Sequence, residues 1–232
     1  MNLRLLAAAC SALAIASAAP AAERNFTVTG FDRIRLDGPY RVRLTTGVAP
    51  FAKASGSSDG LDGISVDVQG RTLVIRKNPS SWGGYPGESP GPIDITVGTH
   101  DLTAVWVNGS GALAVDAAKA QSFDLSLQGA GSVAIGRLSV DTLRVGLTGT
   151  GSAVLGGKAA VATAIVRGTA SLDASALTVK DATVGAEGAA TVKLTATNTA
   201  KVDTQGTASV ELGGAPSCTI RAFGSAVVSG CR

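Results

Sequence analysis

Carboxylate side chains are the first candidates for chemistry in this chain, because two of them converging within ~5–10 Å can cleave a glycosidic bond. From residue 109 onward the acidic residues are Asp116, Asp124, Asp141, Asp173, Asp181, Glu187, Asp203 and Glu211. Only Asp173 and Glu211 occupy equivalent positions in the repeat of this region, and Lys193 stands between them. This spacing predicts a charge ladder on a solvent-exposed face and argues against a catalytic carboxylate group.

The small numbers of histidine and cysteine residues limit the catalytic and metal sites that the chain can form. His100 is the only histidine, so neither a histidine-containing triad nor a multi-histidine metal site can be built. We therefore expect no metal and no cofactor. Cys218 and Cys231 lie close together near the C-terminal end of the sequence, and in an exported protein such a pair predicts a disulfide. Two free buried thiols are the alternative.

Exposed aromatic side chains are the candidates for ligand binding. Trp82 and Tyr85 fall in a Gly-, Pro- and Ser-rich segment, residues 78–92, and long loops with aromatic residues often contact sugars or partner proteins. Trp106 falls three residues before a repeat glycine, at a position that should face outward, and could extend the same patch. Alternatively, the aromatic residues of the loop fold back to cover the stack.

Arginines form a second candidate binding surface. Arg33, Arg35, Arg41 and Arg43 alternate with apolar residues in two predicted strands around the turn at residues 37–39. On one face of adjacent strands they would form a patch for anionic glycans or lipid head groups. The alternative is an edge protected by charge, with nearby aspartates as partners.

A repeat of small residues predicts the fold that positions these candidate side chains. A tetrapeptide opening with glycine recurs at intervals of 18 to 20 residues, beginning at Gly109, Gly129, Gly149, Gly168, Gly188, Gly206 and Gly224. Apolar residues occupy alternate positions on both sides of each glycine, which is the periodicity of strands. Repeats of this length indicate stacked units, and the glycine column fits a sharp corner. The sequence thus predicts a single-stranded parallel β-helix, in which these glycines are structural.

Further features complete this prediction. The core is thin, since 45% of the residues are hydrophobic but only 4% are aromatic. The coil length varies and lacks a six-residue period, which favours a right-handed β-solenoid. Residues 23–100 are rich in strands but lack the glycine repeat, so we expect an irregular N-terminal portion that caps the regular coils of residues 101–232.

The N-terminal end of the sequence predicts export. Arg4, the apolar residues 5–16 and the small-residue site at residues 19–21 are typical of a signal peptide, assigned to residues 1–22. The apolar run is too short to span a bilayer, and no later segment could do so. The net charge of +3 and the lack of a basic run with aromatic residues argue against nucleic acid as a partner. We expect a periplasmic or secreted protein.

The mature sequence resembles the putative auto-transporter adhesin, head GIN domain family. The resemblance rests on Phe31-x-x-Ile34-x-Leu36, on Val42-x-Leu44-x-x-Gly47, on residues 73–75 and on the repeated Gly-Ser-Gly-Ser-like tetrapeptide, which degenerates to Gly-x-Ala in later copies. It implies a right-handed β-helix in exported bacterial proteins, and it brings no catalytic motif or ligand to transfer.

The sequence therefore favours an exported, non-enzymatic β-solenoid that serves as a binding, adhesion or cell-envelope module. A glycan, an envelope polymer or a protein is the expected partner. The alternative is a carbohydrate-active enzyme, a polysaccharide lyase or hydrolase, on the same scaffold.

Overall fold

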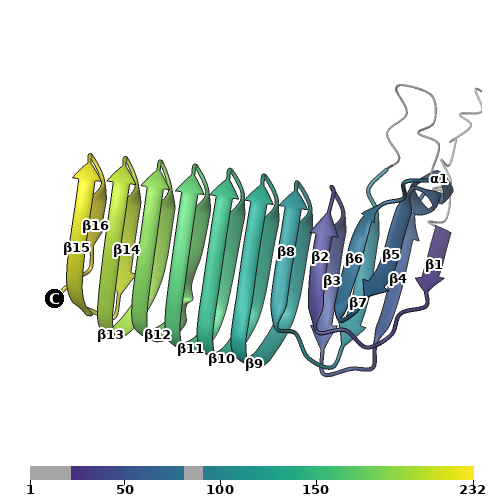
Figure 1. Ribbon diagram of the computed structural model, residues 1–232, viewed down its shortest axis with the longest axis horizontal. Coiled ribbons are helices and arrows are strands. Elements are labelled where there is room, and N and C mark those ends of the chain that lie inside the picture. Colours follow the sequence, from purple (N-terminus) through teal and green to yellow (C-terminus); the bar gives the residue numbers. More distant parts are fainter. Residues whose placement is uncertain (1–21, 81–90) are drawn as a thin grey trace, which may run out of the picture.

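The computed structural model describes residues 22–80 and 91–232 and shows a β-solenoid (Figure 1). On the near face the strands run up to the glycine corners and the chain returns down the far face. With each such turn the chain advances toward the C-terminal end of the solenoid, so the coil is right-handed (Figure 1). Both the parallel β-helix and its handedness agree with the sequence prediction.

The elements are β1 (Ala22–Phe26), β2 (Arg33–Asp37), β3 (Arg41–Thr46), β4 (Phe51–Gly56), α1 (Ser58–Asp62), β5 (Ile64–Gln69), β6 (Thr72–Lys77), β7 (Asp94–Thr99), β8 (Ala104–Gly109), β9 (Ala112–Gly129), β10 (Ser132–Gly149), β11 (Ser152–Gly168), β12 (Ser171–Gly188), β13 (Thr191–Gly206), β14 (Ser209–Gly213), β15 (Ser217–Gly224) and β16 (Val227–Ser229).

Each of the long strands β9 to β13 is one complete coil between two glycine corners. Neighbouring coils pair in parallel, so that equivalent residues stack ~4.8 Å apart. The side chains that alternate inward form continuous apolar columns, for example Leu127, Leu147 and Val166, which are almost fully buried. Burial of these columns against one another holds the stack together.

The repeat glycines occupy the corners for a backbone reason. Gly149 has a φ of +114°, a region that L side chains rarely adopt, and a Cβ there would lie 2.6 Å from the carbonyl oxygen of Gly129. At the same corner the amide of Thr150 donates to that oxygen at 2.9 Å. The glycine column is therefore a line of close backbone contact between coils.

The N-terminal strands are more regular than the sequence suggested. Strands β2 and β3 form a coil of their own, in which β2 pairs in parallel with β8 and β3 pairs in parallel with β9. Gly38, with a φ of +131°, is the corner of this coil, and the amide of Ala112 donates to the carbonyl oxygen of Tyr40 at 2.9 Å. Tyr40 thus takes the place that Gly111 has in the next coil.

This coil corrects the expectation that residues 23–100 lack the repeat. Ile34 and Leu36 precede Gly38 by four and two residues, and Val42 and Leu44 follow it by four and six, as in the later coils. All four side chains are buried. The copy is hard to recognise in the sequence because Pro39 and Tyr40 replace the small residues of the tetrapeptide.

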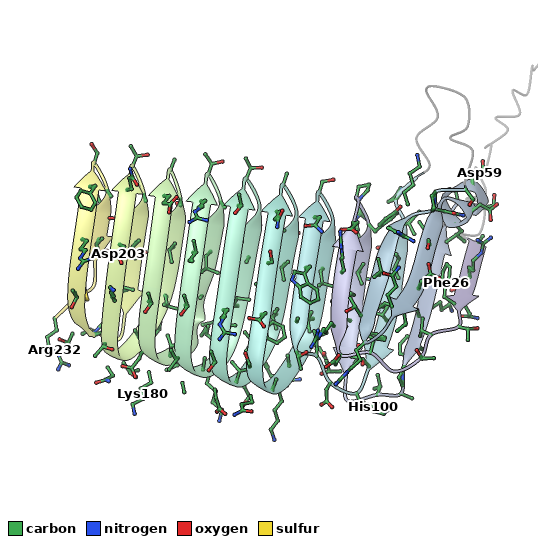
Figure 2. The ribbon with its side chains drawn as sticks, viewed as in Figure 1. Phe26, Asp59, His100, Lys180, Asp203 and Arg232 are labelled. Atoms are coloured by element: carbon green, nitrogen blue, oxygen red, sulfur yellow. A yellow bond between two sulfur atoms is a disulfide. The ribbon has the colours of Figure 1, made fainter. Side chains whose placement is uncertain are left out.

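The N-terminal end of the solenoid is closed by antiparallel strands. Strand β4 pairs with β1 and β7, and β5 forms a hairpin with β6 on the other face. Helix α1, which carries Asp59, lies at this end (Figure 2). Ion pairs connect Arg24 to Asp62 and Lys53 to Glu23, the second at 2.6 Å. Charged side chains and antiparallel pairing protect this edge from further strand addition.

The C-terminal end is less covered. The predicted disulfide between Cys218 and Cys231 is present, with the two Cα atoms 5.7 Å apart, and it fixes the last strands. Ile220 occupies a core column yet is 44% exposed, because no further coil covers it within the described residues. Phe223 is also exposed at this end. None of the described helices could cross a membrane.

Candidate functional site

A groove of about 920 Å³ lies on the face of the solenoid formed by β8 and its neighbours, and we call it the Trp106 groove. Its residues come from five strands that are consecutive in space, in the order β5, β6, β2, β8 and β9. They are Arg35, Asp37, Gln69, Thr72, Val74, Trp106, Asn108, Gln128 and Gly129.

Strand alternation places the Trp106 side chain on the outer face, where it lines this site. Val105 and Val107 are fully buried, so Trp106 between them faces outward and is half-buried. In the parallel register it lies between Arg35 of β2 and Ser126 of β9. The same row of outward residues continues to Asp203, which lies on the near face of the molecule (Figure 2).

Polar side chains beside Trp106 form a short network. Asp37 accepts a hydrogen bond from Nε of Arg35 at 3.1 Å and another from Nδ2 of Asn108 at 2.6 Å. Asp37 and Asn108 are register partners in β2 and β8, so the backbone pairing itself brings them together. The network fixes a carboxylate, a guanidinium and an amide next to an indole ring.

The four arginines predicted as one patch do not lie on one face. Strands β2 and β3 do not pair with each other, because the corner at Gly38 sends them to opposite faces of the coil. Arg33 and Arg35 are on the β8 face, and Arg41 and Arg43 are on the other face. Only Arg35 belongs to the Trp106 groove.

Aspartates lie next to the two arginines on the β8 face. Arg35 pairs with Asp37 at 2.9 Å, and Arg33 lies 3.9 Å from Asp32, which also pairs with Arg71 at 2.6 Å. This pairing agrees with the alternative of a charge-protected strand.

Of the three aromatic residues predicted from the sequence, the structure describes only one. Trp106 lines the groove, whereas Trp82 and Tyr85 lie outside the described residues, and their role stays a prediction. Sequence reasoning considered Asp37 only as a charge partner of the arginines, and it missed Gln69, Asn108 and Gln128. The available signal was the position directly before each corner glycine, which holds Asp37, Asn108 and Gln128 in three successive coils.

Asp173, Lys193 and Glu211 form the charge ladder that the sequence predicted. Lys193 aligns with Asp173 on one side and with Glu211 on the other, and its Nζ lies 3.2 Å from the Glu211 carboxylate. Hydrogen bonds from the Ser175 hydroxyl and amide hold the pKa of Asp173 below its usual range. Within residues 22–80 and 91–232, no three His, Cys, Asp or Glu side chains are grouped to hold a metal ion.

Comparison with known families identifies the chain. The model of the family described as putative auto-transporter adhesin, head GIN domain, matches residues 30–216. The chain belongs to this family. Comparison with curated proteins gave no match.

Solved structures with the same fold are distant in sequence. A putative adhesin from Bacteroides fragilis has a TM-score of 0.76 at 19% identity, with 90% of this chain and 94% of that chain covered. A putative lipid binding protein from Parabacteroides distasonis has a TM-score of 0.72 at 18% identity, with 90% and 96% covered. A putative adhesin from Parabacteroides merdae has a TM-score of 0.67 at 15% identity, with 90% and 95% covered. These similarities establish the fold.

Proposed function

We propose that this GIN-domain protein is an exported, non-enzymatic binding module that holds a glycan in the Trp106 groove. The observation that carries the proposal is the position of a half-buried indole beside the Arg35–Asp37–Asn108 network. An aromatic ring packs against the C–H face of a sugar, and adjacent carboxylate, amide and guanidinium groups bond its hydroxyls.

The composition of the groove favours a glycan over a lipid. Trp106 and Val74 are its apolar side chains, and the remaining side chains are polar or charged. A buried acyl chain needs an enclosed apolar cavity, whereas this groove is open and polar. The description of one structural neighbour as a putative lipid binding protein is therefore a weaker guide here than the groove itself.

The carboxylate content of the groove favours binding over cleavage. Among the described residues that line it, Asp37 is the one carboxylate, and its side chain already accepts hydrogen bonds from Arg35 and Asn108. Glycoside hydrolysis ordinarily requires a pair of carboxylates with distinct acid and base roles. Such a pair is what the hydrolase alternative would need at this site.

Export is part of the proposal and is supported by two features. The N-terminal residues have the composition of a signal peptide, and the Cys218–Cys231 disulfide is typical of an oxidising compartment. Fractionation of cells that express the full chain should find the processed protein in the periplasm or the medium. Retention of unprocessed protein in the cytoplasm would contradict export.

A glycan array with the purified protein tests the proposal directly. We expect selective binding that is lost in Trp106→Ala, because the aromatic platform is removed. Phe223→Ala is the matched control, since it removes another exposed aromatic ring at the C-terminal end, and it should bind like the wild type. Equal binding by wild type and Trp106→Ala would refute the groove as the site. Release of reducing or unsaturated sugars from a bound glycan would favour the enzyme.

A double variant tests the loop aromatic residues separately. We expect Trp82→Ala with Tyr85→Ala to leave the melting temperature nearly unchanged while it weakens glycan binding, because exposed substitutions seldom cost more than ~0.5 kcal/mol. A large fall in the melting temperature would show that these aromatic side chains stabilise the stack.

A further inference from the structure

Two described glycines in the row of Trp106, Gly146 and Gly185, have neither a positive φ nor a close neighbour that excludes a side chain, and Gly146 is the one nearer to the groove. Gly146 of β10 lies two coils beyond Trp106 in the same outward row, with Ser126 between them. Its φ is not in the left-handed region, and a Cβ at this position would meet only the carbonyl oxygen of Leu125, at 4.0 Å. Glycine weakens the interior of a strand, so its presence here needs another explanation. An open surface beside the Trp106 groove supplies one.

The parallel register extends the rows of the groove past Ser126 to Gly146, and we call this strip of small outward residues and the rows beside it the trough. The Trp106 groove reaches β9 through Gln128 and Gly129, one strand short of Gly146. Gln128 and Thr148 are aligned along one side of the Ser126–Gly146 floor. Asp124 and Arg144 are aligned along the other side and are joined at 3.5 Å. The next residue of the row, Ile165, is 41% exposed and closes the floor.

We propose that the ligand is a linear, neutral glycan that lies parallel to the solenoid axis, from the groove over Trp106 and Ser126 to Gly146, and ends at Ile165. This inference rests on the proposed function. The strands cross the trough every ~4.8 Å, a spacing comparable with one pyranose ring, so successive coils present successive sugar sites. An extended β-linked chain fits a straight trough of this kind.

The charges along the trough specify a neutral ligand. Arg35 is paired with Asp37, and Arg144 is paired with Asp124, so each cation of the two walls already has a carboxylate partner. An anionic glycan would have to compete with these carboxylates. The other polar side chains along the path, Asn108, Gln128 and Thr148, suit the hydroxyl and amide groups of neutral sugars.

The experiment compares two glycine variants with oligosaccharides of increasing length. Gly146→Ile places a β-branched side chain in the trough, where the structure has open space. Gly185→Ile is the matched control, because Gly185 is in the same row on the far side of Ile165 and its Cβ would lie 3.9 Å from Ile165 Cγ1, an ordinary contact. The probes are neutral β-1,4-linked N-acetylglucosamine oligomers, from the disaccharide to the hexasaccharide, titrated by calorimetry.

We expect wild-type affinity to rise with oligomer length and then to level off. Gly146→Ile should lower the affinity for the hexasaccharide by about tenfold or more and leave that for the disaccharide nearly unchanged, while Gly185→Ile should match the wild type throughout. Both variants should melt like the wild type.

Other outcomes separate this inference from the proposed function. If Gly146→Ile binds all lengths like the wild type while Trp106→Ala does not bind, the axial trough is wrong and the glycan site stands. If the array shows binding of charged glycans but these neutral oligomers do not bind, the neutral ligand is wrong. If Trp106→Ala binds every glycan like the wild type, the proposed function itself fails.

Discussion

At the scale of single residues, glycine has two distinct roles in this molecule. At the corners its positive φ and the carbonyl oxygen of the preceding coil exclude any side chain, as at Gly149. At Gly146 neither constraint applies, and the missing side chain leaves the surface beside the Trp106 groove open. The corner glycines could be predicted from the sequence because they recur at a fixed interval. The role of Gly146 could not be predicted from the sequence, because that role depends on which residues of the neighbouring coils lie beside Gly146.

The role of glycine at the corners predicts that substitutions at two adjacent residues change the free energy of unfolding by very different amounts. Gly149→Val should lower the free energy of unfolding by ~2 kcal/mol or more, because the new side chain meets the Gly129 carbonyl oxygen in an unfavourable backbone conformation. Thr150→Val should change it little, since Thr150 is exposed. Urea denaturation of the two variants beside the wild type measures both effects. Similar midpoints for the two would mean that the register is wrong.

A second residue-level prediction concerns Asp181. Hydrogen bonds from the Thr199 hydroxyl at 2.6 Å and the Asn198 amide at 2.7 Å lower the pKa of Asp181. A depressed folded pKa means that this group stabilises the fold at pH values above its usual pKa of ~3.9, and that the stabilisation is lost as the pH falls through the folded value.

Removal of the main donor tests this cause. In Thr199→Val the pKa of Asp181 should move up toward its usual value, as followed by NMR titration of the carboxyl carbon. The pKa of Asp173, which is lowered by hydrogen bonds from Ser175 and not by Thr199, serves as the internal control. An unchanged pKa of Asp181 in the variant would show that the Thr199 hydroxyl is not responsible.

At the scale of elements, the spatial order of the coils differs from their order in the chain. The β2–β3 coil stacks between the strands β6 and β7 on one side and β8 and β9 on the other, although β4 to β7 follow it in sequence. Local periodicity predicted that Ile34, Leu36, Val42 and Leu44 lie in strands. It could not predict their partners, because alternation shows which face of a strand is buried and not which strand lies beside it.

This arrangement makes the N-terminal coil part of the common core. Leu36→Ala should lower the free energy of unfolding by about 2–5 kcal/mol, as should Leu127→Ala in a regular coil, because both side chains are almost fully buried. Both variants should keep a single transition in urea, followed by circular dichroism and by tryptophan fluorescence. A separate early transition in Leu36→Ala would show that the N-terminal portion folds independently of the regular coils.

At the scale of the whole molecule, the two ends of the solenoid differ. Antiparallel strands and a short helix close the N-terminal end (Figure 1). Ion pairs reinforce that end, while Ile220 and Phe223 stay exposed at the C-terminal end. In a solenoid each coil is stabilised mainly by its neighbours, so an end coil with one neighbour is the least stable unit. The disulfide compensates by restricting the last strands. The cysteine spacing predicted this bond, but not the exposure around it.

Loss of the disulfide should therefore destabilise the C-terminal coil first. Cys218→Ser with Cys231→Ser should cost about 3 kcal/mol or less, the value expected for a loop of this size, and should speed amide exchange in β15 more than in β10. Hydrogen exchange with mass spectrometry of the oxidised wild type and the double variant measures this. Equal acceleration in both strands would contradict local fraying.

The central claim is that the Trp106 groove holds a glycan, and the fluorescence of Trp106 tests it most directly. The chain has two tryptophans, so Trp82→Phe leaves Trp106 as the single reporter. We expect its emission to shift and saturate as the glycan selected by the array is added, with a midpoint equal to the dissociation constant from calorimetry of the same variant. Saturable binding by calorimetry with no change in Trp106 emission would contradict the account, because the glycan would then bind elsewhere.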